Sequence, residues 1–106
     1  MKYKIYQVKH ENEECRAIKF MSLHFLRKQN LIGYVKRENY QLVYEGSETD
    51  ELCENMTQFL DKLFYIFNCA HPDGYTGHSM STSDIIELEN GDCWYCDSCG
   101  WEKIDF

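Results

Sequence analysis

The sequence has little of what divides a chain into parts. It contains a single proline, Pro72, and six scattered glycines, with no run of Gly, Ser or Pro and no visible repeat. Because linkers between domains are usually rich in such residues, we predict one domain over residues 1–106. A chain of this length can bury roughly 60–70% of the surface that its unfolded form exposes, so it can form one core without staples.

Long apolar runs are also missing. No stretch approaches the roughly 20 residues of a membrane-spanning helix, and residues 1–6 lack the apolar centre of a signal peptide. We therefore expect a cytoplasmic protein that does not engage a membrane. In that reducing compartment the six cysteines are expected to remain free thiols rather than to form disulfides.

An excess of cations is absent. The chain has 11 Lys and Arg against 18 Asp and Glu, a formal charge of −7. Residues 1–44 carry nine basic and four acidic side chains, net +5, whereas residues 45–106 carry two and fourteen, net −12. Since phosphate binding needs clustered cations, the acidic part argues against DNA or RNA as its ligand. It indicates instead a basic partner, or a surface that imitates nucleic acid.

Hydrophobic residues make up 43% of the chain and aromatic residues 15%, which is too rich for disorder. Alternating apolar residues predict strands at 3–8, 40–44, 83–89 and 93–97, with Glu45 and Gly46 ending the second strand. Ser22 is a suitable N-cap for a short helix to about residue 30, with Phe25 and Leu26 facing inward and Gly33 as its stop. Residues 11–14 are expected to form a solvated loop.

The clearest helix follows Ser47 and Asp50, which have the spacing of a capping box. Seven apolar residues then recur at steps of three and four, and we interpret them as one face buried in the core. Each fully buried member contributes about 1.5–3 kcal/mol. They are Leu52, Met56, Phe59, Leu60, Leu63, Phe64 and Phe67.

A loop at 68–81 follows, and Asn90-Gly91 predicts a tight hairpin because both turn positions tolerate positive φ. The predicted fold is therefore an α+β domain. Its small, mainly antiparallel sheet consists of the N-terminal strand, the central strand and the C-terminal hairpin, packed on one long and one short helix.

Three cysteines, Cys93, Cys96 and Cys99, have a spacing that invites a zinc site, with Cys69, His71 or His78 as a further ligand. In a strand, however, Cys93 and Cys96 point to opposite faces and cannot share one ion without a bulge. Buried free cysteine also packs like a small apolar residue. We therefore predict no metal and no cofactor.

The densest polar segment runs from His71 to Asp84. As an enzyme site it would use His78 as a base oriented by Asp84, with a serine as the nucleophile. No Gly-x-Ser-x-Gly elbow, phosphate loop or carboxylate pair accompanies these residues. A long loop must also satisfy its own backbone polar groups, which Ser, Asp and His do well. The prediction is a structural segment without catalytic residues.

This segment resembles the signature of the YodL-like family, HP-x-x-(F/Y)-x-GHSLS-x-SD followed by an apolar strand. The resemblance extends to residues 5–8, 20–22, 40–46 and 95–101, and so covers nearly the whole chain. It implies a small protein of plasmids, phages or conjugative elements of Gram-positive bacteria, with no established activity. The matching residues, interpreted as structural, are His71, Pro72, Tyr75, Gly77, His78, Ser79, Ser81, Ser83 and Asp84.

The family usually shows Val and Phe where this chain has Cys96 and Cys99. The resemblance therefore implies that these two positions are apolar core positions, which further lowers the case for zinc.

The favoured function is that of an inhibitor or adaptor that binds a host protein, in the manner of an anti-CRISPR or anti-restriction protein. The expected partner is a CRISPR effector nuclease or another nucleic-acid-handling protein with a basic groove. The carboxylates expected to occupy that groove are Glu48, Asp50, Glu51, Glu54, Asp61, Glu87, Glu89 and Asp92.

Three alternatives stay open. The basic half could bind single-stranded nucleic acid directly, because its cations are interleaved with aromatic residues that can stack on bases. The cations are Lys2, Lys4, Lys9, Arg16, Lys19, Arg27, Lys28, Lys36 and Arg37, and the aromatic residues are Tyr3, Tyr6, Phe20, Tyr34 and Tyr40. A small hydrolase or nuclease would use His71, His78 and Asp84. Exposed edge strands could also support a homodimer.

Overall fold

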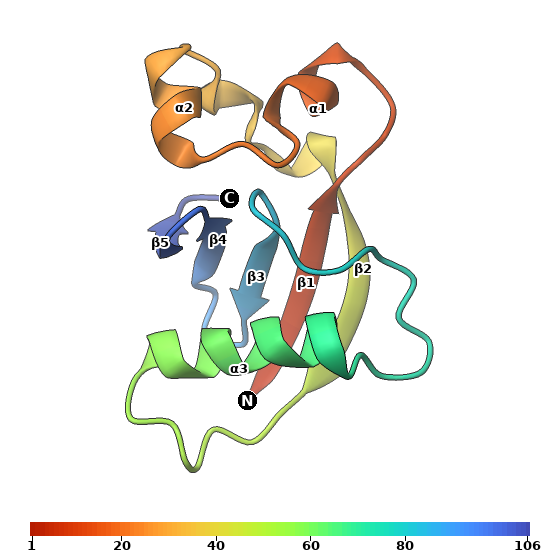
Figure 1. Ribbon diagram of the computed structural model, residues 1–106, viewed down its shortest axis with the longest axis vertical. Helices are drawn as coiled ribbons and strands as arrows, with labels where there is room; N and C mark the ends of the chain where they lie inside the picture. Colours follow the sequence, from red (N-terminus) through yellow and green to blue (C-terminus); the bar gives the residue numbers. More distant parts are fainter.

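A five-stranded antiparallel sheet with the strand order β2-β1-β3-β4-β5 forms the centre of the computed structural model, which describes residues 1–106 (Figure 1). The N-terminal strand β1 lies between β2 and β3 and pairs with both. The predicted α+β class with an antiparallel sheet is confirmed. The strands are β1 (Lys2–Val8), β2 (Tyr40–Ser47), β3 (Ile85–Leu88), β4 (Cys93–Asp97) and β5 (Gly100–Ile104).

Three α-helices and two short 3-10 turns complete the fold. They are α1 (Glu13–Ile18), α2 (Leu23–Lys28), α3 (Met56–Cys69), η1 (Ile32–Tyr34) and η2 (Arg37–Asn39). Ser22 caps α2 as predicted, its Oγ accepting from the Phe25 N–H. The prediction of a loop at 11–14 was wrong. Asn12 is the N-cap of α1, because its side chain accepts from the Cys15 N–H at 2.9 Å.

Helix α3 packs across one face of the sheet (Figure 1). Its Phe59, Leu60, Leu63 and Phe67 are buried against sheet residues that include Ile5. These four residues bear out the core face predicted from their spacing.

Two details of that helix prediction were wrong. The helix begins at Met56 with Asn55 as its cap, so neither Ser47 nor Asp50 starts it. Leu52 lies before the helix and is 95% exposed, while Phe64 is 40% exposed. Residues 48–55 connect the end of β2 to α3. Leu52 lies in this connection, so its spacing from Met56 does not place it on the apolar face of the helix.

The other face of the sheet is covered at its upper end by α1 and α2 (Figure 1). Because neighbouring residues on a strand point to opposite faces, Ile86 packs with α3 and Ile85 with this second cluster. Leu26 is buried there, but Phe25 is 39% exposed, contrary to expectation.

The turns and strand ends also differ from the prediction. Strand β2 continues through Glu45 and Gly46 to Ser47, and β3 begins two residues later than expected. The Leu88 N–H donates to the Asp92 carbonyl, so the hairpin loop has three residues, 89–91, rather than the expected two. Of Asn90 and Gly91, only Gly91 has positive φ. Strand β5 was missed altogether, because its pairing with β4 depends on a tight turn at Ser98 and Cys99.

Candidate functional site

The family-like segment at 71–84 crosses the sheet beside α3 and is held there by a buried glutamine of β1 (Figure 1). The side-chain amide nitrogen of Gln7 lies within 3.0 Å of Asp84 Oδ2, the His78 carbonyl oxygen and the Tyr75 hydroxyl. Its Oε1 accepts from the His78 N–H at 3.1 Å. One side chain therefore ties the first strand to three positions of a segment about seventy residues later.

Gly77 and Tyr75 complete this arrangement. A Cβ at position 77 would clash with Gln7 Oε1 and lie 2.8 Å from the Tyr75 hydroxyl. That hydroxyl also donates to the His78 carbonyl, and the Tyr75 ring packs on Phe67 at 4.9 Å between centroids. The glycine is required by the close approach of β1 rather than by its own backbone angles.

Asp84 is a buried carboxylate, only 1% exposed. Its Oδ2 accepts from the Ser81 N–H at 2.9 Å and from Gln7 at 3.0 Å, while its Oδ1 has no hydrogen-bond partner. Burial raises the pKa of Asp84 to about 7, with the bonds from Ser81 and Gln7 opposing that rise. Asp84 therefore exchanges a proton near neutral pH.

The structure does not bring His78 and Asp84 into the arrangement that the hydrolase or nuclease alternative requires. The ring Nδ1 of His78 lies 2.7 Å from the Ser79 carbonyl, and the structure has no hydrogen bond between His78 and Asp84. Both side chains face the Gln7 amide nitrogen instead, which lies 3.0 Å from Asp84 Oδ2 and 3.3 Å from the Nδ1 of His78. A carboxylate that does not contact the imidazole cannot orient it as a base.

The remaining motif residues are placed as follows. His71 is exposed and packs on the Tyr75 ring at 5.6 Å, and the Pro72 carbonyl accepts from the Tyr75 N–H. The Ser81 hydroxyl donates to the Ser79 carbonyl at 3.0 Å. Ser83 is buried, has φ of 88°, and accepts at its Oγ from the Phe20 N–H at 2.9 Å.

Phe20 is a site residue that the sequence indicated only as one of several aromatic residues in the basic half and as part of the family resemblance at 20–22. It has φ of 66° and is 52% exposed, with its ring against His78 and Lys19. A bulky residue in the left-handed region is rare. No pattern in the sequence marks that conformation.

Cys93 and Cys96 point to opposite faces, as a strand requires. Cys93 packs with the α1 and α2 cluster, whereas Cys96 lies beside Asp61 and Phe64 of α3. Burial raises the pKa of the Cys96 thiol to about 12, so this thiol stays protonated. Cys99 is exposed in the β4–β5 turn, so its expected core position was wrong. The structure brings no three His, Cys, Asp or Glu side chains into a possible metal site.

The carboxylates predicted to bind a partner do not form one surface. Five of the eight have partners within the molecule: Glu48 pairs with Lys62, Glu87 with Arg37, Asp92 with Lys103, Asp61 accepts from Trp101 Nε1, and Glu89 accepts from the Lys2 N–H. Arg37 and Tyr6 both donate hydrogen bonds to the Glu87 carboxylate. Burial alone would raise the pKa of Glu87, but these two bonds lower it below its usual value.

The other three carboxylates, Asp50, Glu51 and Glu54, are exposed and have no side-chain partner. They flank Leu52 along the chain, in a turn that the Cys53 N–H closes on the Asp50 carbonyl at 3.0 Å. We call residues 50–54 the acidic turn. It lies in the segment before α3, at the lower end of the molecule, opposite α1 and α2 (Figure 1).

Ion pairs join the two halves of the sequence at three places, one of which is the Met1 ammonium beside Glu89 at 4.0 Å. Arg27 pairs with Glu102, and Arg37 pairs with Glu87 at 3.1 Å. A third basic residue, Lys36, pairs with Glu14 of its own half. Part of the charge asymmetry is thus neutralised within the fold, and the carboxylates of the acidic turn are among those that have no ion-pair partner.

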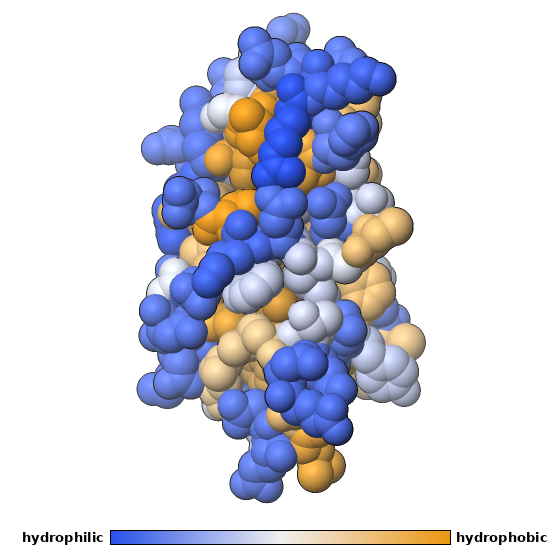
Figure 2. All heavy atoms as spheres, turned by 90° about the vertical axis from the view of Figure 1, so that its left-hand side faces the viewer, coloured by the Kyte–Doolittle hydropathy of each residue, from blue (hydrophilic) through white to orange (hydrophobic).

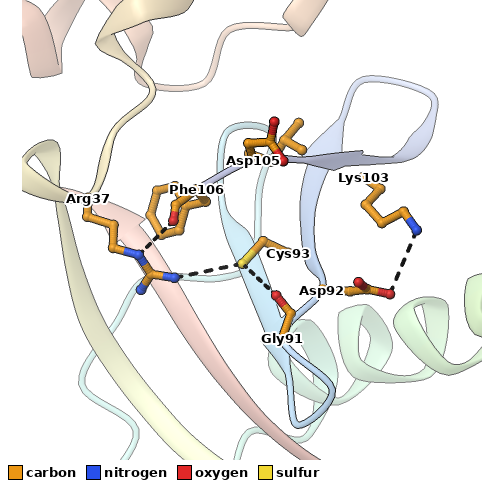
Figure 3. A pocket seen from close by; sticks show the side chains of 8 residues that line it. Arg37, Gly91, Asp92, Cys93, Lys103, Asp105 and Phe106 are labelled. Atoms are coloured by element: carbon orange, nitrogen blue, oxygen red, sulfur yellow. Dashed lines mark hydrogen bonds and ion pairs between the residues drawn. The ribbon is translucent and has the colours of Figure 1, made fainter.

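Two hollows flank the β5 edge. One is lined by four apolar residues, Leu23, Ile32, Val35 and Ile104, and by four charged ones. Figure 2 shows apolar atoms in the upper half of this side. The other encloses about 460 Å³ between β4, β5 and Arg37 (Figure 3). Arg37 donates to the Phe106 carbonyl at 2.8 Å and stacks on the Phe106 ring, so its guanidinium is already occupied by the protein's own groups.

The fold and the buried glutamine network define a small antiparallel α+β domain organised around its HP…GHS…SD segment. The chain belongs to the YodL-like family: a family model described as the YodL-like domain matches residues 2–106. No curated protein and no solved structure matches the chain. None of the helices has the length and apolar character needed to cross a bilayer.

Proposed function

We propose that the chain is a small inhibitor or adaptor, encoded by a mobile genetic element, that acts by binding a protein through its acidic turn. The observation that carries this proposal is the turn itself. Leu52 is 95% exposed, and Asp50, Glu51 and Glu54 around it have no internal partner. An apolar anchor ringed by charges of one sign is suited to a basic surface that offers an apolar pocket.

Each component contributes separately to such binding. Burying a leucine supplies about 1.5–3 kcal/mol, and three carboxylates steer the encounter with a basic surface and speed association. The class of partner proposed is a nucleic-acid-handling host protein with a groove for phosphates, such as a CRISPR effector nuclease or a restriction enzyme. The carboxylates would then stand where phosphates bind.

Direct binding of nucleic acid is the second candidate, supported by the surplus of cations among residues 9–37. Three of these cations, Arg27, Lys36 and Arg37, are paired with carboxylates. That pairing reduces the charge available to phosphates and places this candidate behind the first. A gel-shift assay with single-stranded DNA at low salt tests it, and a shift that disappears in the variant Arg16→Glu would support it.

The acidic turn is tested with two matched charge reversals. Tagged wild-type chain, Glu51→Lys/Glu54→Lys and Glu11→Lys/Glu38→Lys are used to capture proteins from a Gram-positive host lysate, with identification by mass spectrometry. The two double variants change the net charge equally, but the second alters exposed carboxylates outside the acidic turn.

We expect a basic protein that is captured by the wild type and by Glu11→Lys/Glu38→Lys, is lost with Glu51→Lys/Glu54→Lys or Leu52→Ser, and weakens as salt rises. Equal capture by both double variants would show that the acidic turn is not the contact.

A further inference from the structure

We propose that Phe20 is the anchor of a second contact surface, which inserts into an apolar pocket with an acidic rim on a protein partner. This surface consists of Phe20, Lys19, His10 and His78. Phe20 and Lys19 lie in the connection between α1 and α2, His10 precedes α1, and His78 belongs to the segment between α3 and β3. The α1–α2 connection lies above the sheet, away from the acidic turn (Figure 1). The second surface is independent of that turn and does not depend on the function proposed for it.

The first observation is a pair of strained residues that touch. Phe20 and Ser83 both have positive φ, 66° and 88°, although neither is a glycine. The Phe20 N–H donates to Ser83 Oγ at 2.9 Å. Such backbone conformations persist only where the surroundings impose them, and they gather at functional sites.

The surroundings that impose this conformation belong to the family-like segment. The Ser83 carbonyl accepts from the Tyr40 hydroxyl at 2.8 Å, and the Ser83 N–H donates to the Cys96 carbonyl at 2.9 Å. Ser83 is therefore fixed from two strands, and its side chain in turn fixes the backbone of Phe20. Ser83 of the motif therefore fixes the backbone of Phe20, a residue more than sixty positions earlier in the chain.

The consequence of this conformation is exposure. Ile18 and Leu23, on either side of Phe20, are completely buried, whereas the Phe20 ring is 52% exposed. A strained backbone that turned a phenylalanine into the core would stabilise the fold. A strained backbone that turns it out to solvent gives the ring only its contacts with Lys19 and His78 within the chain. It leaves half-exposed an aromatic side chain of the type that anchors protein interfaces.

The groups around the ring indicate the chemistry of the partner. The Lys19 ammonium lies 5.3 Å from the ring centroid and His78 packs against the ring at 5.5 Å. His10 lies 2.7 Å from the same ammonium, and no carboxylate pairs with Lys19. A pocket that receives the ring would therefore bring Lys19 to its rim, where a carboxylate complements it.

The orientation of His78 adds a polar contact. Its Nδ1 lies 2.7 Å from the Ser79 carbonyl, which accepts and so fixes the proton on Nδ1. The other ring nitrogen, Nε2, is left without a hydrogen bond within the protein. A protein pocket is favoured over a stacked base because Lys19 lies over one face of the Phe20 ring and His78 packs against the ring, which leaves less of it open for stacking.

The variant Phe20→Gly separates a binding role from a structural role. Glycine adopts positive φ freely, so Phe20→Gly should unfold at the same temperature as the wild type or at a higher one. Asn30→Gly is the matched control, because Asn30 is also exposed with φ of 60°. The probe is a display library of random peptides, panned against the immobilised full chain.

We expect selected peptides that combine an aliphatic residue with Asp or Glu. Their affinity, measured by calorimetry, should fall by about tenfold or more with Phe20→Gly and with Lys19→Glu, and stay unchanged with Asn30→Gly. The proposal is overturned if Phe20→Gly lowers the unfolding temperature, if the selected peptides bind that variant as well as the wild type, or if single-stranded DNA binds the wild type but not Phe20→Gly.

Discussion

The side-chain amide of Gln7 donates to the carboxylate of Asp84 at 3.0 Å, joining β1 to the last residue before β3 in the interior of the protein. Both residues are buried, and the second carboxylate oxygen has no partner. This pair connects the first strand to the family-like segment, and it makes the stability of the whole domain sensitive to both positions.

Replacing Gln7 by Ala should lower the free energy of unfolding by about 2–4 kcal/mol, because the His78 N–H and Asp84 would lose buried partners together. Urea unfolding followed by circular dichroism measures the change. Gln41→Ala is the control, since Gln41 faces Gln7 in the β1–β2 register but is exposed. A loss below about 0.5 kcal/mol for Gln7→Ala would mean that the network contributes little.

The stability of the protein should depend on pH through Asp84. Burial raises its pKa from 3.8 to about 7, so between these values the folded protein holds a proton that the unfolded chain releases. The free energy of unfolding therefore falls as pH rises from about 4 to about 7, by up to about 4 kcal/mol from this group. Below pH 4 the contribution is complete.

Asp84→Asn isolates this effect, because its side chain keeps the shape but cannot ionise. The variant should be more stable than the wild type at pH 8, and its own pH profile should lack the fall between pH 4 and 7. That fall should therefore appear in the wild-type-minus-variant difference of urea midpoints. Asp73→Asn removes the same charge from an exposed position of the same segment and should leave the wild-type profile intact. An Asp84→Asn profile parallel to the wild type would exclude Asp84 as its source.

Gly77→Ala should destabilise the fold by about 1–3 kcal/mol, because the added methyl group would overlap Gln7 Oε1 and crowd the Tyr75 hydroxyl. Gly33→Ala serves as the comparison, since a Cβ there meets nothing within 4 Å. Thermal unfolding of both variants gives the difference. Similar unfolding temperatures for the two would show that β1 and the segment can move apart at little cost.

A buried and an exposed leucine should differ in their contribution to the free energy of unfolding. Leu63→Ala removes a fully buried side chain between α3 and the sheet and should cost about 2–5 kcal/mol. Leu52→Ala alters a side chain that is 95% exposed and should change the free energy of unfolding by less than about 0.5 kcal/mol. A large loss for Leu52→Ala, measured by chemical unfolding, would assign Leu52 to folding and remove it as a free anchor.

Several features of the fold could be predicted because they depend on short-range spacing. The alternation in β1 and β2, the Ser22 cap and the buried residues of α3 all follow from patterns within one element. The elements that were missed, α1 and β5, are short and are stabilised by what they pack or pair with. Helix α1 buries Cys15 and Ile18 in the second cluster, and β5 exists through its pairing with β4.

The amino-acid sequence by itself determined the family, the antiparallel α+β class and the division into a basic and an acidic half, because each is present in composition or local order. Only the tertiary structure decided which carboxylates stay free, because pairing such as that of Glu87 with Arg37 joins residues fifty positions apart. It also decided that Gln7, rather than His78, meets Asp84, and that Phe20 turns outward. These outcomes depend on long-range packing and hydrogen bonds, which spacing along the chain does not encode.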